Sequence, residues 1–182
     1  MIGILNVGIG NLGSVQNAVY QNGFDPLMVD AVSQFDDLTH LILPGVGSFS
    51  AVVLGIEMRQ LRQPILNFVD SGRPLLGTCL GMQLLMAVGE EGGIHDGLGL
   101  IPGRVKRLSC GGLRVPHVGW NMLNMSRPHP IYDGIKKGRD FYFAHSYTAV
   151  CDEEGDLLGS AEYGGIISAV IGRANVVGMQ FH

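Results

Sequence analysis

Short apolar runs alternate with helical segments through the first half of the chain, and this alternation restricts the fold more than any other feature. The runs that read as strands are Ile2–Val7, Pro26–Asp30, His40–Leu43 and Pro74–Thr78, and the helices predicted among them are Leu12–Asn22, residues 50–71 and Leu80–Val88. Strands and helices that alternate at this spacing pair in parallel through right-handed crossovers. We therefore expect an α/β fold with a doubly wound, largely parallel sheet flanked by helices.

The second half of the chain has a different pattern. Residues 92–119 are rich in glycine and proline, and the strand-like runs of this half are Arg104–Leu108, Leu113–His117, Phe141–Ala149, Leu157–Tyr163, Gly165–Ile171 and Asn175–Phe181. Their spacing and the turn residues between them predict hairpins. We expect antiparallel additions to the sheet, so that residues 1–182 form a single domain.

Composition excludes several classes of protein. Hydrophobic residues make up 46% of the chain and the formal net charge is −4, so there is no basic footprint for nucleic acid. Residues 38–56 are uncharged, but Pro44 and three glycines interrupt them, which argues against a membrane-spanning helix. The three cysteines form no C-x-x-C pair, which fits a reducing cytoplasm. Cysteines and histidines also lack metal-ligand spacing, so we expect no metal site.

A dinucleotide fingerprint is present at the first strand end. Gly8–Gly13 reads G-x-G-x-x-G after a strand and before a helix, and Asp30 ends the next strand where a ribose-binding acid would lie. An NAD-binding oxidoreductase is therefore an alternative function. The chain contains 28 glycines, however, and a glycine-rich turn in such a chain carries little information by itself.

A second motif points to a different chemistry. Cys79 ends an apolar strand and lies between Gly77 and Gly81, which is the G-x-nucleophile-x-G pattern with cysteine at its centre. The backbone N–H of Leu80 is a candidate oxyanion donor, and Pro44–Gly47 ends a neighbouring strand with further N–H groups. Ligands of open α/β sheets bind beyond the carboxyl ends of the strands. We expect these strand ends and the Gly8–Gly13 loop to converge on one crevice.

A cysteine nucleophile requires a base, and histidine is the usual one. The candidates are His40, His95, His117, His129, His145 and His182. His145 and His182 both end strand-like runs and are favoured by position, whereas His117 is expected to be structural. The spacing does not decide between His145 and His182.

The motifs together resemble a known family. The segments that carry the resemblance are VGIGNLGSV (7–15), LPGVGSF (43–49), GTCLGMQ (77–83), RVPHVGWN (114–121), YFAHSYTAVC (142–151) and GMQFH (178–182). They resemble the class I glutamine amidotransferases and, more narrowly, the glutaminase subunits of imidazole glycerol phosphate synthase. We expect Trp120, in the fourth segment, to pack against the protein rather than contact a ligand.

The resemblance implies a role for each matching residue. Cys79 would attack the glutamine carboxamide, with His182 as acid and base. The oxyanion hole would be formed by backbone N–H groups of Leu80 and of the loop Gly45, Val46 and Gly47. The glutamine-binding residues that the resemblance implies are Gln83, Ser146 and Tyr147. Ammonia would then pass to a (β/α)₈-barrel cyclase partner in histidine biosynthesis, and the reaction would need no cofactor.

Three points stay open at the level of sequence. The family motif reads F-H-P-E, whereas this sequence reads Phe181-His182 at its end, and we expect the chain to continue beyond it to the triad glutamate. The same chemistry could supply ammonia for a surface-polysaccharide sugar. The chain could also be a catalytically silent binding subunit.

Overall fold

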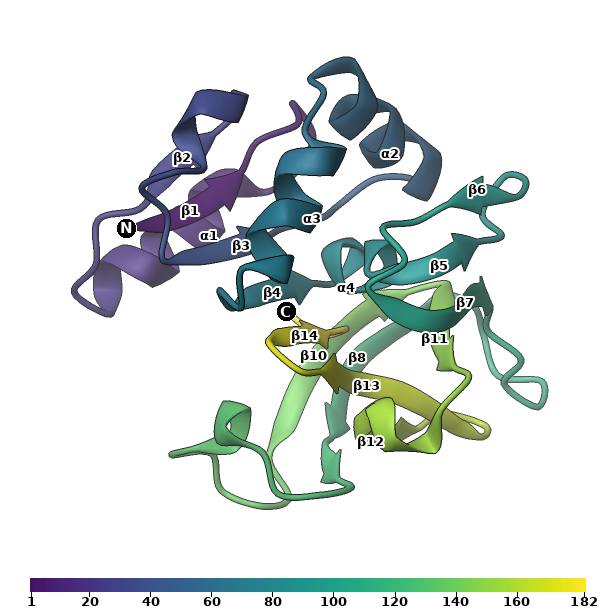
Figure 1. Cartoon of the computed structure of the whole chain (residues 1–182). Helices are drawn as coiled ribbons and strands as arrows, with labels where there is room; N and C mark the ends of the chain where they lie inside the picture. Colours follow the sequence, from purple (N-terminus) through teal and green to yellow (C-terminus); the bar gives the residue numbers. More distant parts are fainter.

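The central sheet is parallel in its first half. The structure is a computed structural model and describes residues 1–182. Eight strands follow the order β2-β1-β3-β4-β14-β13-β12-β9 (Figure 1). The parallel strands are β2 (Leu27–Val29), β1 (Ile2–Leu5), β3 (His40–Leu43), β4 (Leu75–Thr78) and β14 (Val176–Met179). The chain winds outward from β1 in both directions, which confirms the doubly wound parallel sheet that the sequence predicts.

Antiparallel strands complete the sheet. They are β13 (Ile166–Arg173), β12 (Leu157–Glu162) and β9 (Asn124–Met125). The predicted hairpins are therefore confirmed. Strand β14 pairs antiparallel with β13 and parallel with β4, and Met179 lies opposite Thr78 in that register. The segment after β14 is thus held beside the segment after β4.

Helices cover both faces of the parallel half. Helix α1 (Leu12–Gln21) lies on one face, and α2 (Phe49–Met58) and α3 (Arg62–Asp70) lie on the other (Figure 1). No helix combines the length and apolar character needed to cross a bilayer.

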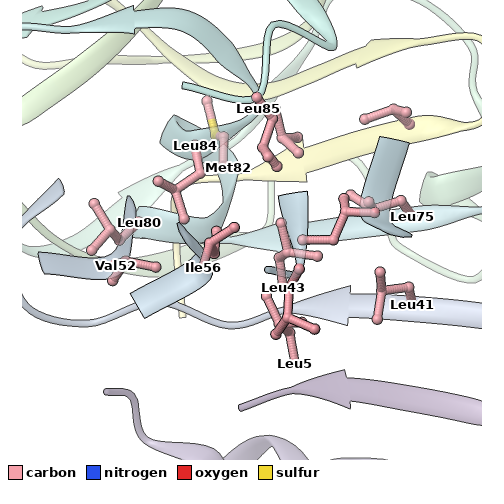
Figure 2. Packing of buried hydrophobic residues seen from close by; sticks show 14 of the residues in the cluster. Leu5, Leu41, Leu43, Val52, Ile56, Leu75, Leu80, Met82, Leu84 and Leu85 are labelled. Atoms are coloured by element: carbon pink, nitrogen blue, oxygen red, sulfur yellow. The ribbon is translucent and has the colours of Figure 1, made fainter. Parts of the chain in front are cut away.

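Alternation along the strands explains how both faces are filled. Leu41 and Leu43 of β3 belong to one buried cluster with Val52 and Ile56 of α2 (Figure 2). Ile42 points to the opposite face, beside α1. Each such fully buried side chain contributes about 1.5–3 kcal/mol.

Two smaller sheets lie next to the antiparallel half. The first has the order β11-β7-β5-β6, and the second pairs β10 with β8 in antiparallel fashion. Their bounds are β5 (Met86–Gly89), β6 (His95–Asp96), β7 (Ile101–Arg107), β8 (His117–Met122), β10 (Asp140–His145) and β11 (Tyr147–Cys151). The short helices are α4 (Leu80–Leu84) and the 3₁₀ turns Val32–Gln34, Pro130–Tyr132 and Glu154–Asp156.

Three predicted elements are wrong in extent. The helix expected over Leu80–Val88 ends at Leu84, and the chain continues as β5. The run Phe141–Ala149 is two strands in different sheets, separated at Ser146. The strand expected over Leu113–His117 only begins at His117, because residues 113–116 are irregular and end in a bend. An unbroken apolar run looks alike in a buried helix and a buried strand, and tertiary pairing decides between them.

Candidate active site

Cys79 lies on a strained turn between β4 and α4. Its backbone has φ 54° and ψ −113°, a conformation that residues with a side chain rarely adopt. Two glycines permit the turn: a Cβ on Gly77 would lie 2.5 Å from the carbonyl oxygen of Gly81, and a Cβ on Gly81 would overlap the carbonyl oxygen of Leu43. Such strain costs about 1–3 kcal/mol and persists where the surrounding structure enforces it. The turn presents the thiol at the carboxyl edge of the sheet.

The loop after β3 packs directly against this turn. A Cβ on Gly45 would lie 2.5 Å from the backbone nitrogen of Gly81 and 2.6 Å from Cβ of Leu80, so glycine is required between them. On the other side, a Cβ on Gly47 would lie 3.1 Å from Cγ2 of Ile9 in the first glycine loop. The three glycine-rich strand ends therefore converge, as predicted.

A cavity of about 390 Å³ opens above the turn. It suits a small molecule, since ligand pockets generally measure about 300–1,000 Å³. The residues of its lining that the sequence analysis named for a role are Val46, Gly47, Cys79, Leu80, Gln83, His145, Ser146, Tyr147 and His182. Gly45 lies behind this lining, against the turn.

Gln83 connects the cavity to the interior. Its side chain is buried, and its Nε2 donates to the backbone oxygen of Tyr147 at 3.1 Å and to Oε1 of Gln180 at 2.9 Å. Gln180, which the sequence analysis did not single out, donates from Nε2 to the sulfur of Cys79 at 3.7 Å. Both amide hydrogens of Gln83 are thus used inside the protein, and its Oε1 remains for a ligand.

His145 is engaged at both ring nitrogens. Its Nδ1 lies 2.8 Å from the backbone oxygen of Tyr147 and must donate there, so its Nε2 accepts from Nδ1 of His117 at 3.0 Å. Nε2 of His117 then accepts from the side chain of Asn121 at 3.3 Å. Burial lowers the pKa of both histidines, that of His145 to about 4. His145 therefore has no nitrogen left to take a proton from Cys79.

His182 reaches the same cavity from the segment after β14. Its backbone N–H donates to the carbonyl oxygen of Tyr142 at 2.9 Å, which ties this segment to β10. Partial burial lowers the pKa of its imidazole, so the ring is neutral near pH 7 and can accept a proton. No hydrogen bond joins the His182 ring to the sulfur of Cys79. The geometry favours His182 over His145 as the base.

The protonation state of Cys79 follows from opposing effects. Burial raises the pKa of its thiol, while the N–H groups of Leu80 and Gln180 act to lower it. Because the first effect is the largest, the free protein holds a thiol near neutral pH. A nucleophile in this state needs a base to remove its proton during attack.

The remaining candidate histidines lie outside the cavity. His40 is exposed and its Nδ1 lies 3.0 Å from the hydroxyl of Thr39. His129 accepts from the backbone N–H of Ile131 at 3.1 Å and begins a 3₁₀ turn. His95 is half-buried, with its ring centroid 6.5 Å from that of Phe49. None of the three is therefore placed to take a proton from Cys79.

The glycine fingerprint at the first strand lacks one physical requirement of a dinucleotide site. In such sites the third glycine permits close packing of helix on strand. Here a Cβ added to that glycine, Gly13, would meet nothing within 4 Å. Asn11 in the same loop instead accepts from the backbone N–H of Ser14 and caps α1. The loop serves to begin the helix.

One acidic residue of the cavity was missed in the sequence. Glu91 is the only carboxylate in the lining, and its Oε2 accepts from the backbone N–H of Phe49 at 2.7 Å. That hydrogen bond joins the turn after β5 to the start of α2. Glu91 belongs to no spacing motif, and only the folded chain brings it beside the cysteine. Glu91 therefore places an acidic side chain in the same cavity as Cys79.

Comparisons with known proteins agree with this geometry. A family model described as Glutamine amidotransferase class-I matches residues 4–182. The curated protein "Imidazole glycerol phosphate synthase subunit HisH" of Desulfitobacterium hafniense is 43% identical over 182 residues, covering 100% of this chain and 86% of the relative. The protein of the same name from Moorella thermoacetica is 43% identical over 181 residues, with coverage of 100% and 86%.

Solved structures share the fold at much lower sequence identity. One described as "Structure of PurLQS from Thermotoga maritima" superposes with a TM-score of 0.77 at 19% identity, covering 100% of this chain and 86% of that chain. Another, described as a crystal structure of a glutamine amidotransferase, gives a TM-score of 0.75 at 19% identity and covers 100% and 89%. These neighbours establish the fold class.

Proposed function

The chain belongs to the class I glutamine amidotransferases, and from this premise we propose that it is the glutaminase subunit of imidazole glycerol phosphate synthase. It hydrolyses glutamine to glutamate and ammonia, and a (β/α)₈-barrel cyclase partner uses the ammonia to make imidazole glycerol phosphate in histidine biosynthesis. One observation carries the proposal: relatives of that name match along the whole chain. The strained Cys79, which lies in a cavity of substrate size, supports it. The three cysteines are free, which supports placing the reaction in the reducing cytoplasm.

In the proposed mechanism Cys79 is the nucleophile and His182 the acid and base. The sulfur attacks the carboxamide carbon as His182 takes the thiol proton, and the resulting oxyanion faces the N–H groups of Leu80 and residues 45–47. His182 then gives this proton to the carboxamide nitrogen. The carbon–nitrogen bond breaks, ammonia departs, and a glutamyl thioester of Cys79 remains. Water, deprotonated by His182, hydrolyses this thioester to glutamate and restores the thiol.

The lining of the cavity supplies groups for the amino-acid end of the substrate. Glu91 carries the negative charge that pairs with the α-ammonium group of glutamine. Gln83 offers its Oε1 to the same group or to the carboxamide, because its nitrogen is already engaged. Ser146 and Tyr147, which follow β10, line the same cavity. A substrate held by these groups would have its carboxamide directed at the sulfur.

The strand pair beside the cavity offers a surface for the cyclase partner. Val118, Trp120 and Met122 alternate along one side of β8, and Tyr142 of β10 lies opposite Trp120. Trp120, expected to pack inside the protein, is in fact 74% exposed, and the other three side chains are also exposed. Val118 belongs to the cavity lining as well. We call these four residues the β8–β10 face. A partner that covers it would lie at the mouth of the cavity and could receive ammonia directly.

The test is a coupled assay with the purified cyclase. Glutamate release is measured from glutamine with the protein alone, with the cyclase, and with the cyclase plus its nucleotide substrate. We expect the cyclase to stimulate release and Cys79→Ala to abolish it, while Cys151→Ser, outside the cavity, retains it. Growth of a histidine auxotroph that lacks the glutaminase subunit provides the second readout. Glutaminase activity without rescue would instead indicate another ammonia acceptor, and complex formation without activity a silent subunit.

A further inference from the structure

A fully buried glutamine touches the reacting sulfur. Gln180 follows β14, its exposed fraction is 0%, and it is not among the residues that line the cavity. Its backbone N–H donates to the carbonyl oxygen of Ala169 at 2.9 Å, which fixes its place at the edge of the sheet. Its side chain lies between Gln83 and Cys79. A glutamine amide is costly to bury unless both ends are hydrogen-bonded, so its position behind the nucleophile requires an explanation.

The hydrogen bonds determine which end of the amide faces the sulfur. The carbonyl oxygen of Tyr147 can only accept, so the group of Gln83 that lies 3.1 Å from it must be the donor Nε2. The same Nε2 lies 2.9 Å from the side chain of Gln180, where it must meet an oxygen. Gln180 therefore turns its NH₂ group toward Cys79. The backbone carbonyl of Tyr147 thus fixes the orientation of both amides, so that the NH₂ group of Gln180 donates to the sulfur of Cys79.

We propose that Gln180 tunes the nucleophile, because its N–H stabilises the thiolate of Cys79 over the thiol. The proposal rests on the function proposed above, in which Cys79 is the nucleophile. A thiolate is a far better acceptor than a thiol, so a fixed donor favours the charged form. This donor opposes the burial that favours the thiol. The Gln180 amide reaches the sulfur from behind the cavity and is therefore present before and after the substrate binds.

Two substitutions that keep the length of the side chain separate the effect of the N–H donor from the effect of side-chain size. Gln180→Met keeps the length of the side chain and removes the N–H, and Gln180→Glu replaces the donor by an acceptor that becomes negative when ionised. The other titratable groups that line the cavity with Cys79 are His182 after β14, His145 at the end of β10 and Glu91 after β5, and none of them is changed. We expect the thiol pKa of Cys79 to rise in the order wild type, Gln180→Met, Gln180→Glu.

The measurement is the rate of alkylation of Cys79 by iodoacetamide as a function of pH, followed by mass spectrometry of the Cys79 peptide. Iodoacetamide does not resemble glutamine, so the profile reports the thiol alone. A hydrogen bond to a charged group is strong enough for the Gln180→Met profile to move up by about one pH unit. The Cys151 peptide of the same digest is the internal control and should not move. An unchanged or lowered Cys79 profile in Gln180→Met overturns the proposal.

A second measurement needs no variant at position 180. In the wild-type protein, the side-chain amide resonances of Gln180 should shift with pH at the midpoint of the Cys79 alkylation profile, and this titration should vanish in Cys79→Ala. Amide resonances that stay constant through that midpoint refute the contact. Labelling by a glutamine-like diazoketone tests Cys79 as the nucleophile separately. A labelled Cys79 with an unmoved alkylation profile therefore contradicts only the role of Gln180.

Discussion

The turn around Cys79 predicts that Gly81→Ala damages the protein severely. The new Cβ would overlap the carbonyl oxygen of Leu43 and lie 2.8 Å from its carbonyl carbon. Overpacking against movable side chains costs about 1–3 kcal/mol. Here both groups belong to the backbone of Leu43, which cannot move easily because Leu43 pairs with Gly77 in the parallel sheet. The clash can therefore be relieved only if α4 moves away from β3. We expect a loss of at least about 3 kcal/mol, above the ordinary range for single substitutions.

The assay is thermal unfolding, combined with alkylation of Cys79. For a protein of this size, 1 kcal/mol corresponds to about 2–4 °C in Tm, so Gly81→Ala should melt at least about 6 °C below the wild type. Relief of the clash would also move the thiol from the cavity and slow its alkylation. Gly13→Ala is the matched control, since its Cβ meets nothing within 4 Å and the position lies in α1. Alanine in a helix should stabilise it by about 0.5–1 kcal/mol.

Two results of the comparison between Gly81→Ala and Gly13→Ala would contradict this reasoning. If Gly81→Ala melts with the wild type and alkylates at the same rate, the turn is not held as described. If Gly13→Ala is the damaging substitution, the first loop has the close packing that a dinucleotide fingerprint requires. Either result would refute the assignment of the two glycine motifs.

Three further predictions concern pH, substrate and partner. Burial lowers the pKa of His145 to about 4, so as the pH falls the unfolded chain binds a proton at this residue before the folded protein does. The free energy of unfolding should therefore fall by roughly 3 kcal/mol between pH 6.5 and pH 4. In His145→Asn, urea denaturation should show a smaller decrease of this free energy over the same pH range. Glu91→Gln should raise KM for glutamine about tenfold or more through loss of a charged hydrogen bond, whereas Glu90→Gln, whose carboxylate pairs with Arg104 at 3.7 Å on the surface, should leave KM unchanged. Trp120→Ala should weaken cyclase binding in calorimetry by about 2 kcal/mol or more if the β8–β10 face is the docking surface, and an unchanged affinity would move the interface elsewhere.

The sequence predicts the parallel half well because its signals are local. Each strand from β1 to β4 is a short apolar run, and alternation with helices dictates parallel pairing. The second half is less predictable. Met86 is fully buried and pairs with Ile101 of β7, yet nothing in its own run distinguishes it from a helical residue. The break at Ser146 is invisible for the same reason, because only the separate partners of β10 and β11 reveal it.

The residues of the candidate site also differ in how far the local sequence predicts them. Cys79 and its two glycines form a local motif, so a strained turn can be inferred before any fold is known. His145 and His182 look equivalent in the sequence, and the choice between them depends on a hydrogen bond from His117, 28 residues away. Nothing in the GMQFH segment indicates the contact that Gln180 makes, and Glu91 belongs to no motif. Their partners lie 101 residues away at Cys79 and 42 residues away at Phe49, and such contacts exist only after the sheet has formed.

The most direct test of the central claim is the mass of the protein after incubation with a glutamine-like diazoketone. This reagent alkylates an activated thiol within a glutamine pocket. We predict one adduct that maps to Cys79, is slowed by excess glutamine, is absent in Cys79→Ala, and spares Cys110 and Cys151. An adduct at either of those two cysteines, or no adduct at Cys79 in the presence of the cyclase partner, would contradict the assignment of this cavity as a glutaminase site.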